Sequence, residues 1–291
     1  MVNDDLSLAR AAAIAGAAEA MRHFATLADL PREVKEDGSV VTLADRAVEA
    51  TIRKILVAAR PGDAILGEEE GETAGISAES GTAGISGEGG TAGISAEGGT
   101  AGAGGRRWII DPIDGTALFV AGDDRWLVLV ALEEHGEITA GVAVVPAIGR
   151  MWWAGLGTGA YEAKLHDDRI LDETRIRVAA DAARKIEGSR LGVVPSWGRE
   201  VAAPLLDLAD EREWPLHPPL MIARGDLDVA VQTCGSIWDF AATSLIIAEA
   251  GGFYRGLNGR TTPGAGPSLF AANADLRDEA LGLLNATPAT R

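Results

Sequence analysis

Hydrophobic and polar residues recur along the chain with two different periods, which predict helices in some segments and strands in others. Helical spacing is seen in residues 5–28, and a second helix is predicted from Thr42 to Arg60, where Thr42 and Asp45 have the spacing of a capping box. Further helices are predicted over residues 116–120, 202–210, 239–250 and 275–285. Short apolar runs predict strands over residues 108–110, 127–132, 138–145, 151–154, 191–194, 227–232 and 269–273. This mixture, without strict alternation, favours layered α and β structure over a barrel.

A short repeat interrupts this pattern. The word TAGIS begins at residues 73, 82 and 91, and TAG recurs at residue 100, a nine-residue period. Each full copy offers one isoleucine among Gly, Ser, Thr and Glu, and the repeat lacks the aspartates of calcium-binding nonapeptides. We therefore interpret residues 72–105 as a flexible low-complexity insertion, against the alternative of a small ordered β-structure. Whether it acts as a lid or as an inert loop stays open.

Composition narrows the classes of partner. Of 291 residues, 47% are hydrophobic, enough for a substantial core, and the net charge of −17 disfavours nucleic acid and anionic membranes as partners. The chain shows no secretory signal and no run of about 18 apolar residues that could span a membrane, so we expect a cytoplasmic protein. The single cysteine, Cys234, excludes an intramolecular disulfide framework and is expected to be buried and inert.

Two acids follow the apolar run at Trp108 in the stretch WIIDPIDGT. Asp111 and Asp114 are three residues apart, with Pro112 and Gly115 favouring a turn. Two carboxylates this close raise each other's pKa unless a positive charge lies between them. Magnesium suits carboxylates combined with a phosphate. On this motif alone, an Asp-Pro turn with a capping aspartate is an equally good interpretation.

Two further acidic segments favour the metal interpretation. Glu68 to Glu70 follow another short apolar run, and Asp239 opens the helix predicted over 239–250. Taken singly, the glutamates are typical of a solvated charge run and Asp239 of an N-cap. Three acidic elements, each beside an apolar segment, together predict a shared metal site. The four histidines, His23, His135, His166 and His217, have no metal-ligand spacing and receive no role.

These segments resemble the signatures of the inositol monophosphatase superfamily. The matching stretches are WIIDPIDGTALF, Gly67-Glu68-Glu69, residues 238–252 and the segment from Lys35 to Asp45; Trp126 and the tryptophans within residues 151–155 look most like the histidinol-phosphate phosphatase branch. The resemblance implies an α-β-α-β-α sandwich of the inositol monophosphatase and fructose-1,6-bisphosphatase type. It also implies hydrolysis of a small phosphate monoester with two or three Mg²⁺ ions. A non-catalytic relative and a nucleotide 3′-phosphatase are the alternatives.

The same resemblance assigns roles to individual residues. Thr116 with Glu68 would orient the attacking water. Asp45 would form a hydrogen bond with Thr116, and Lys35 would lie near the metal-bound waters. Gln232 stands where relatives usually carry a glutamate that contacts the leaving group. The residues implied to bind metal are Glu68, Asp111, the carbonyl of Ile113, Asp114 and Asp239, and those implied to contact substrate are Gly115, Thr116, Gln232 and Asp239.

The resemblance also predicts how the chain is divided, and the spacing of the acids disfavours another class of phosphatase. We expect an N-terminal α+β half, residues 1–145, that carries the metal site, and a C-terminal α/β half, residues 146–291, that contributes Asp239. The expected partner is a small phosphorylated alcohol, and a homodimer stays open. Haloacid-dehalogenase-like phosphatases are disfavoured because their paired acids lie two residues apart, whereas Asp111 and Asp114 lie three apart.

Overall fold

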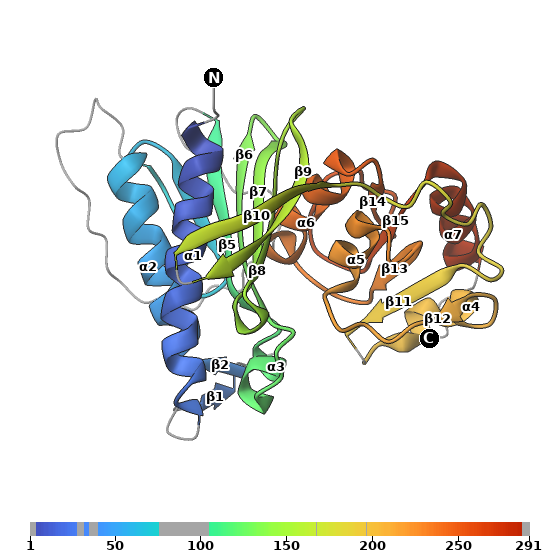
Figure 1. Cartoon of the computed structure of the whole chain (residues 1–291), viewed down its shortest axis with the longest axis horizontal. Helices are drawn as coiled ribbons and strands as arrows, with labels where there is room; N and C mark the ends of the chain where they lie inside the picture. Colours follow the sequence, from blue (N-terminus) through green and yellow to red (C-terminus); the bar gives the residue numbers. More distant parts are fainter. Residues whose placement is uncertain are drawn as a thin grey trace.

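The computed structural model describes residues 4–27, 32–34, 40–75, 105–166, 168–195 and 197–286. Their helices and strands form five layers in the order helices, sheet, helices, sheet, helices (Figure 1). The α-β-α-β-α sandwich expected from the sequence is therefore confirmed. None of the helices in these ranges is long and apolar enough to cross a membrane.

The larger sheet has eight strands in the order β10-β9-β8-β7-β6-β5-β3-β4. All neighbouring strands are antiparallel except β3 and β5, which are parallel. The division expected at residue 145 falls inside this sheet, because its last strand ends at Ile176. The strands are β3 (Ala64–Gly67), β4 (Gly71–Thr73), β5 (Arg106–Asp114), β6 (Leu127–Glu134), β7 (Glu137–Val145), β8 (Arg150–Gly155), β9 (Gly159–His166) and β10 (Arg169–Ile176).

Two long helices, α1 (Asp4–Phe24) and α2 (Leu43–Ala59), cover the outer face of this sheet. Small residues let the helices approach closely, since a Cβ atom at Gly16 would lie 2.7 Å from Ile52 Cδ1. The capping box predicted at the start of α2 is confirmed: Thr42 is the N-cap, and the carboxylate of Asp45 accepts a hydrogen bond from the Thr42 backbone N–H. A two-stranded ribbon, β1 (Arg32–Val34) and β2 (Val40–Thr42), and the short helix α3 (Thr116–Ala121) lie at one end of this half.

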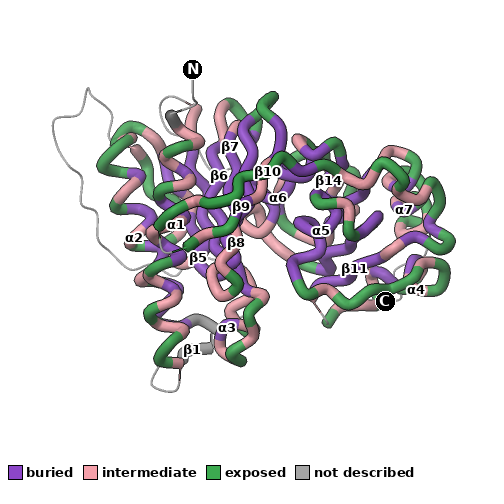
Figure 2. Tube along the Cα trace, viewed as in Figure 1, coloured by how far each residue is buried: buried purple, intermediate pink, exposed green. Residues whose placement is uncertain are grey.

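The central layer contains α6 (Ile237–Glu249) and α5 (Pro218–Arg224). Every residue of α6 from 240 to 247 is buried, as expected of a helix that is apolar on all sides. It packs against strands of the larger sheet on one side and against β14 (Phe253–Gly256) on the other. Figure 2 shows the buried residues concentrated in the two sheets and α6, with exposed residues along β10 and the outer helices. The central core thus encloses most of α6, and the first turn of this helix borders the candidate site.

The smaller sheet has five strands in the order β12-β11-β13-β15-β14. The pairs formed by β11 with β12 and with β13 are parallel, and the other two pairs are antiparallel. The helices α4 (Ala203–Leu206) and α7 (Ala274–Ala286) cover its outer face. The remaining strands are β11 (Arg190–Val194), β12 (Asp210–Glu211), β13 (Val229–Gln232) and β15 (Ser268–Ala271).

The prediction of one long helix over residues 202–210 is wrong. A 3₁₀ turn, Arg199–Ala202, leads into the four-residue α4, and the chain then joins the small sheet as β12. The strands β9 and β10 and the helix α5 were not predicted. Most of β10 is exposed, so it lacks the apolar alternation of a half-buried strand, and α5 begins with two prolines, which fit only the first turn of a helix.

Candidate metal centre and substrate cleft

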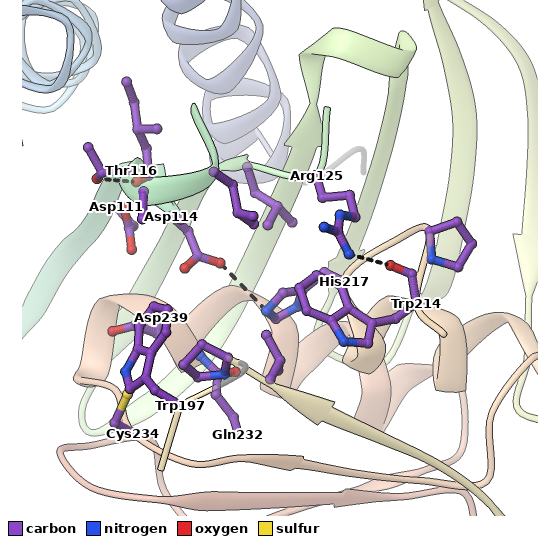
Figure 3. Close-up of a pocket in the computed structure, with 18 of the residues that line it drawn as sticks. Asp111, Asp114, Thr116, Arg125, Trp197, Trp214, His217, Gln232, Cys234 and Asp239 are labelled. Carbon is purple, nitrogen blue, oxygen red and sulfur yellow. Dashed lines mark hydrogen bonds and ion pairs between the residues drawn. The ribbon is translucent and has the colours of Figure 1, made fainter. Parts of the chain in front are cut away.

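A cleft of about 1080 Å³ lies where the end of β5, the first turn of α6 and the end of β13 come together (Figure 3). It is lined at one end by Glu68, Asp111, Asp114 and Asp239. Glu68 and Asp239 are 171 positions apart in the sequence. The packing of the larger sheet against α6 brings them to the same cleft. The acids predicted to share a site therefore face one cleft.

The two acids of β5 are brought to the same side by a β-bulge. From Asp111 to Asp114 the chain advances three residues, while the opposite step on β6, from Leu129 to Leu127, covers two. Residues three apart on a regular strand point to opposite faces, and one extra residue cancels that difference. The sequence suggested a turn after Ile110, whereas the strand continues through Asp114. The bulge, and not a turn, orients the two carboxylates to the same side.

Asp239 reaches the same point from α6. Ser236 is the N-cap of this helix, and Asp239 occupies the third helical position, where its Oδ2 accepts the Ser236 N–H at 2.7 Å. The simpler interpretation of Asp239 as the N-cap is therefore wrong. The capping box fixes the carboxylate of Asp239, and one oxygen each of Asp111, Asp114 and Asp239 lie within 4.8 Å of one another.

This cluster is electrostatically unfavourable without a cation. Burial, followed by repulsion from Glu68, Asp114 and Asp239, raises the pKa of Asp111 well above its usual range. Burial and the charges of Asp239 and Glu68 do the same for the pKa of Asp114, and burial raises the pKa of Asp239 to about 6. Asp111 Oδ1 and Asp114 Oδ2 are buried and have no hydrogen-bond partner among the described residues. Orphaned, mutually repelling carboxylate oxygens are the donor set that a hard divalent cation satisfies.

Thr116 and Asp45 form a connected pair beside the acids. Thr116 Oγ1 lies 3.0 Å from Asp45 Oδ1 and 3.1 Å from the carbonyl oxygen of Ile113, and its single proton can be donated to one of them. Asp45 Oδ2 accepts the N–H and hydroxyl of Thr42 at 2.8 and 2.7 Å. Asp45 is fully buried, and this burial raises its pKa despite these hydrogen bonds. The predicted contact between Asp45 and Thr116 is thus present.

Gly115 allows the chain to turn sharply between β5 and α3. Its φ of +85° lies in the left-handed region that glycine adopts without strain. Gly115 and Thr116 both line the cleft beside the acids. The predicted residue Lys35, together with residues 76–104 of the repeat insertion, lies outside the described residues, although Glu72 and Thr73 at the start of that insertion belong to β4.

The other end of the cleft contains residues that the sequence did not single out. His217 is the N-cap residue of α5, is buried, and lies with its Nε2 3.6 Å from Asp114 Oδ2 (Figure 3). Burial lowers its pKa to about 4, so the ring is neutral at pH 7. Its neighbour in the sequence, Leu216, points into the core instead. The sequence offered no signal for His217, because no other histidine lies at metal-ligand spacing from it. Its contact with Asp114 arises only from the fold.

Gln232, predicted to contact the leaving group, ends β13 and lines this end of the cleft. It is buried, and its Oε1 has no hydrogen-bond partner among the described residues. The guanidinium of Arg125 lies 4.3 Å from the centroid of the Trp214 ring and donates to the Trp214 carbonyl at 3.3 Å. Trp197 also lines the cleft, with 61% of its surface exposed. This end is therefore aromatic and polar, and its acids, Glu211 and Glu213, are exposed rather than buried.

Cys234 lies at the same end and corrects another expectation. It is exposed and lines the cleft, so the prediction of a buried cysteine is wrong. Partial burial of the thiol and the charge of Asp239 raise its pKa, which keeps the thiol protonated at neutral pH. A protonated thiol is a poor nucleophile and metal ligand.

Comparison with known proteins places the chain among phosphatases of one kind. The model of the inositol monophosphatase family matches residues 2–192 and 219–287. The chain is 36% identical over 293 residues to a histidinol-phosphatase of Streptomyces coelicolor, with 97% of each chain covered. It is 29% identical over 252 residues to an inositol-1-monophosphatase of Mesorhizobium japonicum, covering 82% of this chain and 80% of the relative.

Solved structures show the same fold. The chain superposes on a Thermotoga maritima IMPase with a TM-score of 0.71 over 97% of both chains, at 23% identity. The stretch between the two segments matched by the family model, residues 193–218, supplies Trp197, Trp214 and His217 to the cleft. The family match therefore includes the acidic end of the cleft and leaves out much of the wall of the other end.

Proposed function

Because the chain belongs to the inositol monophosphatase family, we propose that it is a Mg²⁺-dependent phosphatase that hydrolyses a small phosphate monoester with water as the nucleophile. The enzyme class is phosphoric monoester hydrolase. The observation that carries the proposal is the cluster of Asp111, Asp114 and Asp239, whose ligand oxygens lie within 4.8 Å of one another and of which two buried oxygens accept no hydrogen bond from the described residues. When bound there, Mg²⁺ acidifies water and stabilises negative charge on the phosphate oxygens.

The proposed ligands come from three parts of the chain. Asp111, Asp114 and the carbonyl of Ile113 are offered by the end of β5, Asp239 by α6, and Glu68 by the turn between β3 and β4. We assign two or three hard cations to this set, because such cations take oxygen ligands. If Thr116 donates its proton to Asp45, the Ile113 carbonyl is free to serve as a ligand.

Thr116 and Glu68 orient the nucleophile in this proposal. The Thr116 hydroxyl donates to Asp45, which leaves its lone pairs to accept a hydrogen bond from water. The carboxylate of Glu68 is the acceptor for the second proton of that water. Gly115 and Thr116 present their backbone N–H groups to the phosphate. Lys35 is assigned to the water network by the family resemblance.

The substrate is proposed to be histidinol phosphate or inositol-1-phosphate, the classes named for the relatives. Two features of the polar end favour a neutral polyol. Gln232 offers a neutral carbonyl oxygen that accepts no hydrogen bond from the residues described, and His217 is a neutral ring. Arg125, beside the Trp214 ring, donates to both carboxylate oxygens of Asp123 at 2.8 and 2.7 Å, so this ion pair adds little net charge at that end. The acids Glu211 and Glu213 also line the cleft, but both are exposed, so their attraction for a cation is weakened by solvent.

A panel of phosphate monoesters tests the proposal. Purified protein is assayed with histidinol phosphate, inositol-1-phosphate and adenosine 3′-phosphate, first with Mg²⁺ and then with EDTA. We expect turnover of at least one monoester with Mg²⁺, loss of that turnover with EDTA, and recovery when Mg²⁺ is added in excess. Metal binding without turnover of any monoester would identify a non-catalytic relative and contradict the proposal.

A further inference from the structure

A buried carboxylate outside the predicted site holds the segment that carries Glu68. Glu49 of α2 has no exposed surface, and its side chain reaches the turn between β3 and β4. Its Oε2 accepts the backbone N–H of Glu69 at 2.8 Å, and its Oε1 accepts that of Glu70 at 3.1 Å. The backbone N–H of Glu68 itself donates to the Ile110 carbonyl at 3.3 Å. Three consecutive N–H groups are thus fixed.

The glycine before Glu68 provides the space for this contact. A Cβ atom built on Gly67 would lie 2.1 Å from Glu49 Oε1 and 2.4 Å from its carboxyl carbon, so any larger residue would displace the carboxylate. Gly67 has no positive φ, so its need for glycine is steric and not conformational. The glycine of the Gly-Glu-Glu motif, at the end of β3, therefore leaves room for the Glu49 side chain from α2.

Arg53, one turn further along α2, stabilises the buried charge of Glu49. Its Nε donates to Glu49 Oε1 at 2.8 Å. Its two terminal nitrogens reach β4, donating to the Thr73 hydroxyl at 2.9 Å and to the Gly71 carbonyl at 2.5 Å. A buried carboxylate is costly unless it is paired and hydrogen-bonded, and Glu49 meets both conditions. The pair thus links α2, the turn and the strand that follows it.

We propose that Glu49 is the positioning residue for the metal ligand Glu68: with Arg53 as its counter-ion, it fixes the β3–β4 turn so that the Glu68 carboxylate is held at the acidic end of the cleft. The inference rests on the proposed metal-dependent function. Groups that hold a metal ligand in place typically change metal affinity about 10- to 100-fold when they are removed. Weaker metal binding with an unchanged fold is therefore its expected signature.

The first test is Mn²⁺ binding, followed by the electron paramagnetic resonance of free Mn²⁺, since Mn²⁺ accepts the oxygen ligands that suit Mg²⁺. Glu49→Gln keeps the size of the side chain, but its single carbonyl oxygen cannot serve Arg53 and both N–H groups. Gly67→Ala pushes the carboxylate away. We expect each variant to raise the Kd for Mn²⁺ about tenfold or more. In a Glu49→Ala background, Gly67→Ala should add little, because the two changes act through one contact.

A matched control separates positioning from general destabilisation. Asp228→Asn weakens another ion pair of a buried carboxylate, in which the half-buried Arg190 donates to Asp228 at 2.7 Å beside the smaller sheet and outside the cleft lining. It should lower Tm and leave the Kd for Mn²⁺ unchanged. Hydrogen exchange followed by mass spectrometry gives a direct readout: a peptide covering residues 67–73 should exchange faster in Glu49→Gln and not in Asp228→Asn.

Each outcome decides between the two proposals. A folded Glu49→Gln whose Kd stays within about twofold of the parent overturns the positioning role. Should that variant not fold, Gly67→Ala and Arg53→Lys decide, and an unchanged Kd in both overturns it equally. Absence of Mn²⁺ binding in the parent protein would contradict the proposed function instead. In that case unchanged exchange of the 67–73 peptide in the Glu49 and Gly67 variants would still reject the positioning of the turn.

Discussion

The two ends of the cleft are built in different ways. At the acidic end, local backbone devices aim the side chains: a β-bulge for Asp111 and Asp114, and a capping box for Asp239. At the polar end, Trp197 follows β11, whose Val194 pairs with Gln232 of β13 within the smaller sheet, and His217 precedes α5, so these residues meet only through the pairing and packing of elements that are distant in sequence. The acidic end can therefore be recognised from short motifs, and the polar end cannot. Chemistry is specified locally here, while the choice of alcohol depends on the whole fold.

Asp111→Asn is expected to have the largest effect and tests whether the acidic end acts as a unit. The amide removes one charge and one donor oxygen from the buried cluster. Groups that act together lose most of their effect when one is removed, so kcat/KM should fall by several orders of magnitude. The measurement is steady-state kinetics at saturating Mg²⁺. Asp228→Asn, which alters a buried acid far from the cleft, serves as the control, and near-normal turnover of Asp111→Asn would contradict the metal assignment.

The motifs indicated which residues lie together at this end because its geometry depends on few residues. The spacing of Asp111 and Asp114 pointed to a pair, and the family resemblance added Thr116 and Asp45, which do form a hydrogen bond. The pattern did not reveal the bulge, because a strand with one extra residue looks like a turn in sequence. It also gave no sign of Glu49, whose contact with the β3–β4 turn joins residues 20 positions apart.

Gln232→Glu tests the polar end directly. A carboxylate at this position would form a charge-assisted bond with the ammonium of histidinol, while the present amide offers only a neutral hydrogen bond. We expect the ratio of kcat/KM for histidinol phosphate to that for inositol-1-phosphate to rise about tenfold, equivalent to about 1.4 kcal/mol. Both substrates are measured with the same enzyme preparation, so loss of active protein cancels. An unchanged ratio would show that Gln232 does not face the alcohol.

The elements that the sequence did not predict, and the site residues that it did not indicate, were missed for the same physical reason. The outer strand β10 is largely exposed, and the helix predicted over 202–210 ends after Leu206, since the residues that follow pair with β11 as β12. In both places tertiary pairing, and not local periodicity, decides the structure. His217 belongs to the same class. Its place in the cleft is visible only once the start of α5 has been brought to Asp114 at the end of β5.

Trp197→Ala should have a smaller effect, confined to binding. The Trp197 ring lines the cleft, and the Trp197 carbonyl accepts a hydrogen bond from the Thr233 hydroxyl at 2.9 Å, so its backbone stays anchored when the ring is removed. Loss of an aromatic contact of about 1 kcal/mol corresponds to a rise in KM of about fivefold, with kcat unchanged because the acids are untouched. Leu208→Ala removes an exposed apolar side chain outside the cleft and is the control. A fall in kcat instead would mean that Trp197 takes part in ordering the reacting groups.

The smallest effect is expected from removing the repeats. This deletion tests whether the segment that supports the metal site ends at β4. Replacing residues 76–104 by a short Gly-Ser linker spares Gly71 and Thr73, the partners of Arg53. Loop-closure entropy changes by only about 0.6 kcal/mol per doubling of loop length, so kcat and the Kd for Mn²⁺ should stay within about twofold of the parent. A deletion that begins at residue 71 removes those partners and should weaken Mn²⁺ binding, although it differs by only five residues. If the shorter deletion lowers kcat strongly while the circular dichroism spectrum is unchanged, the repeats act as a lid over the cleft, and the acidic end includes more of the chain than the β3–β4 turn.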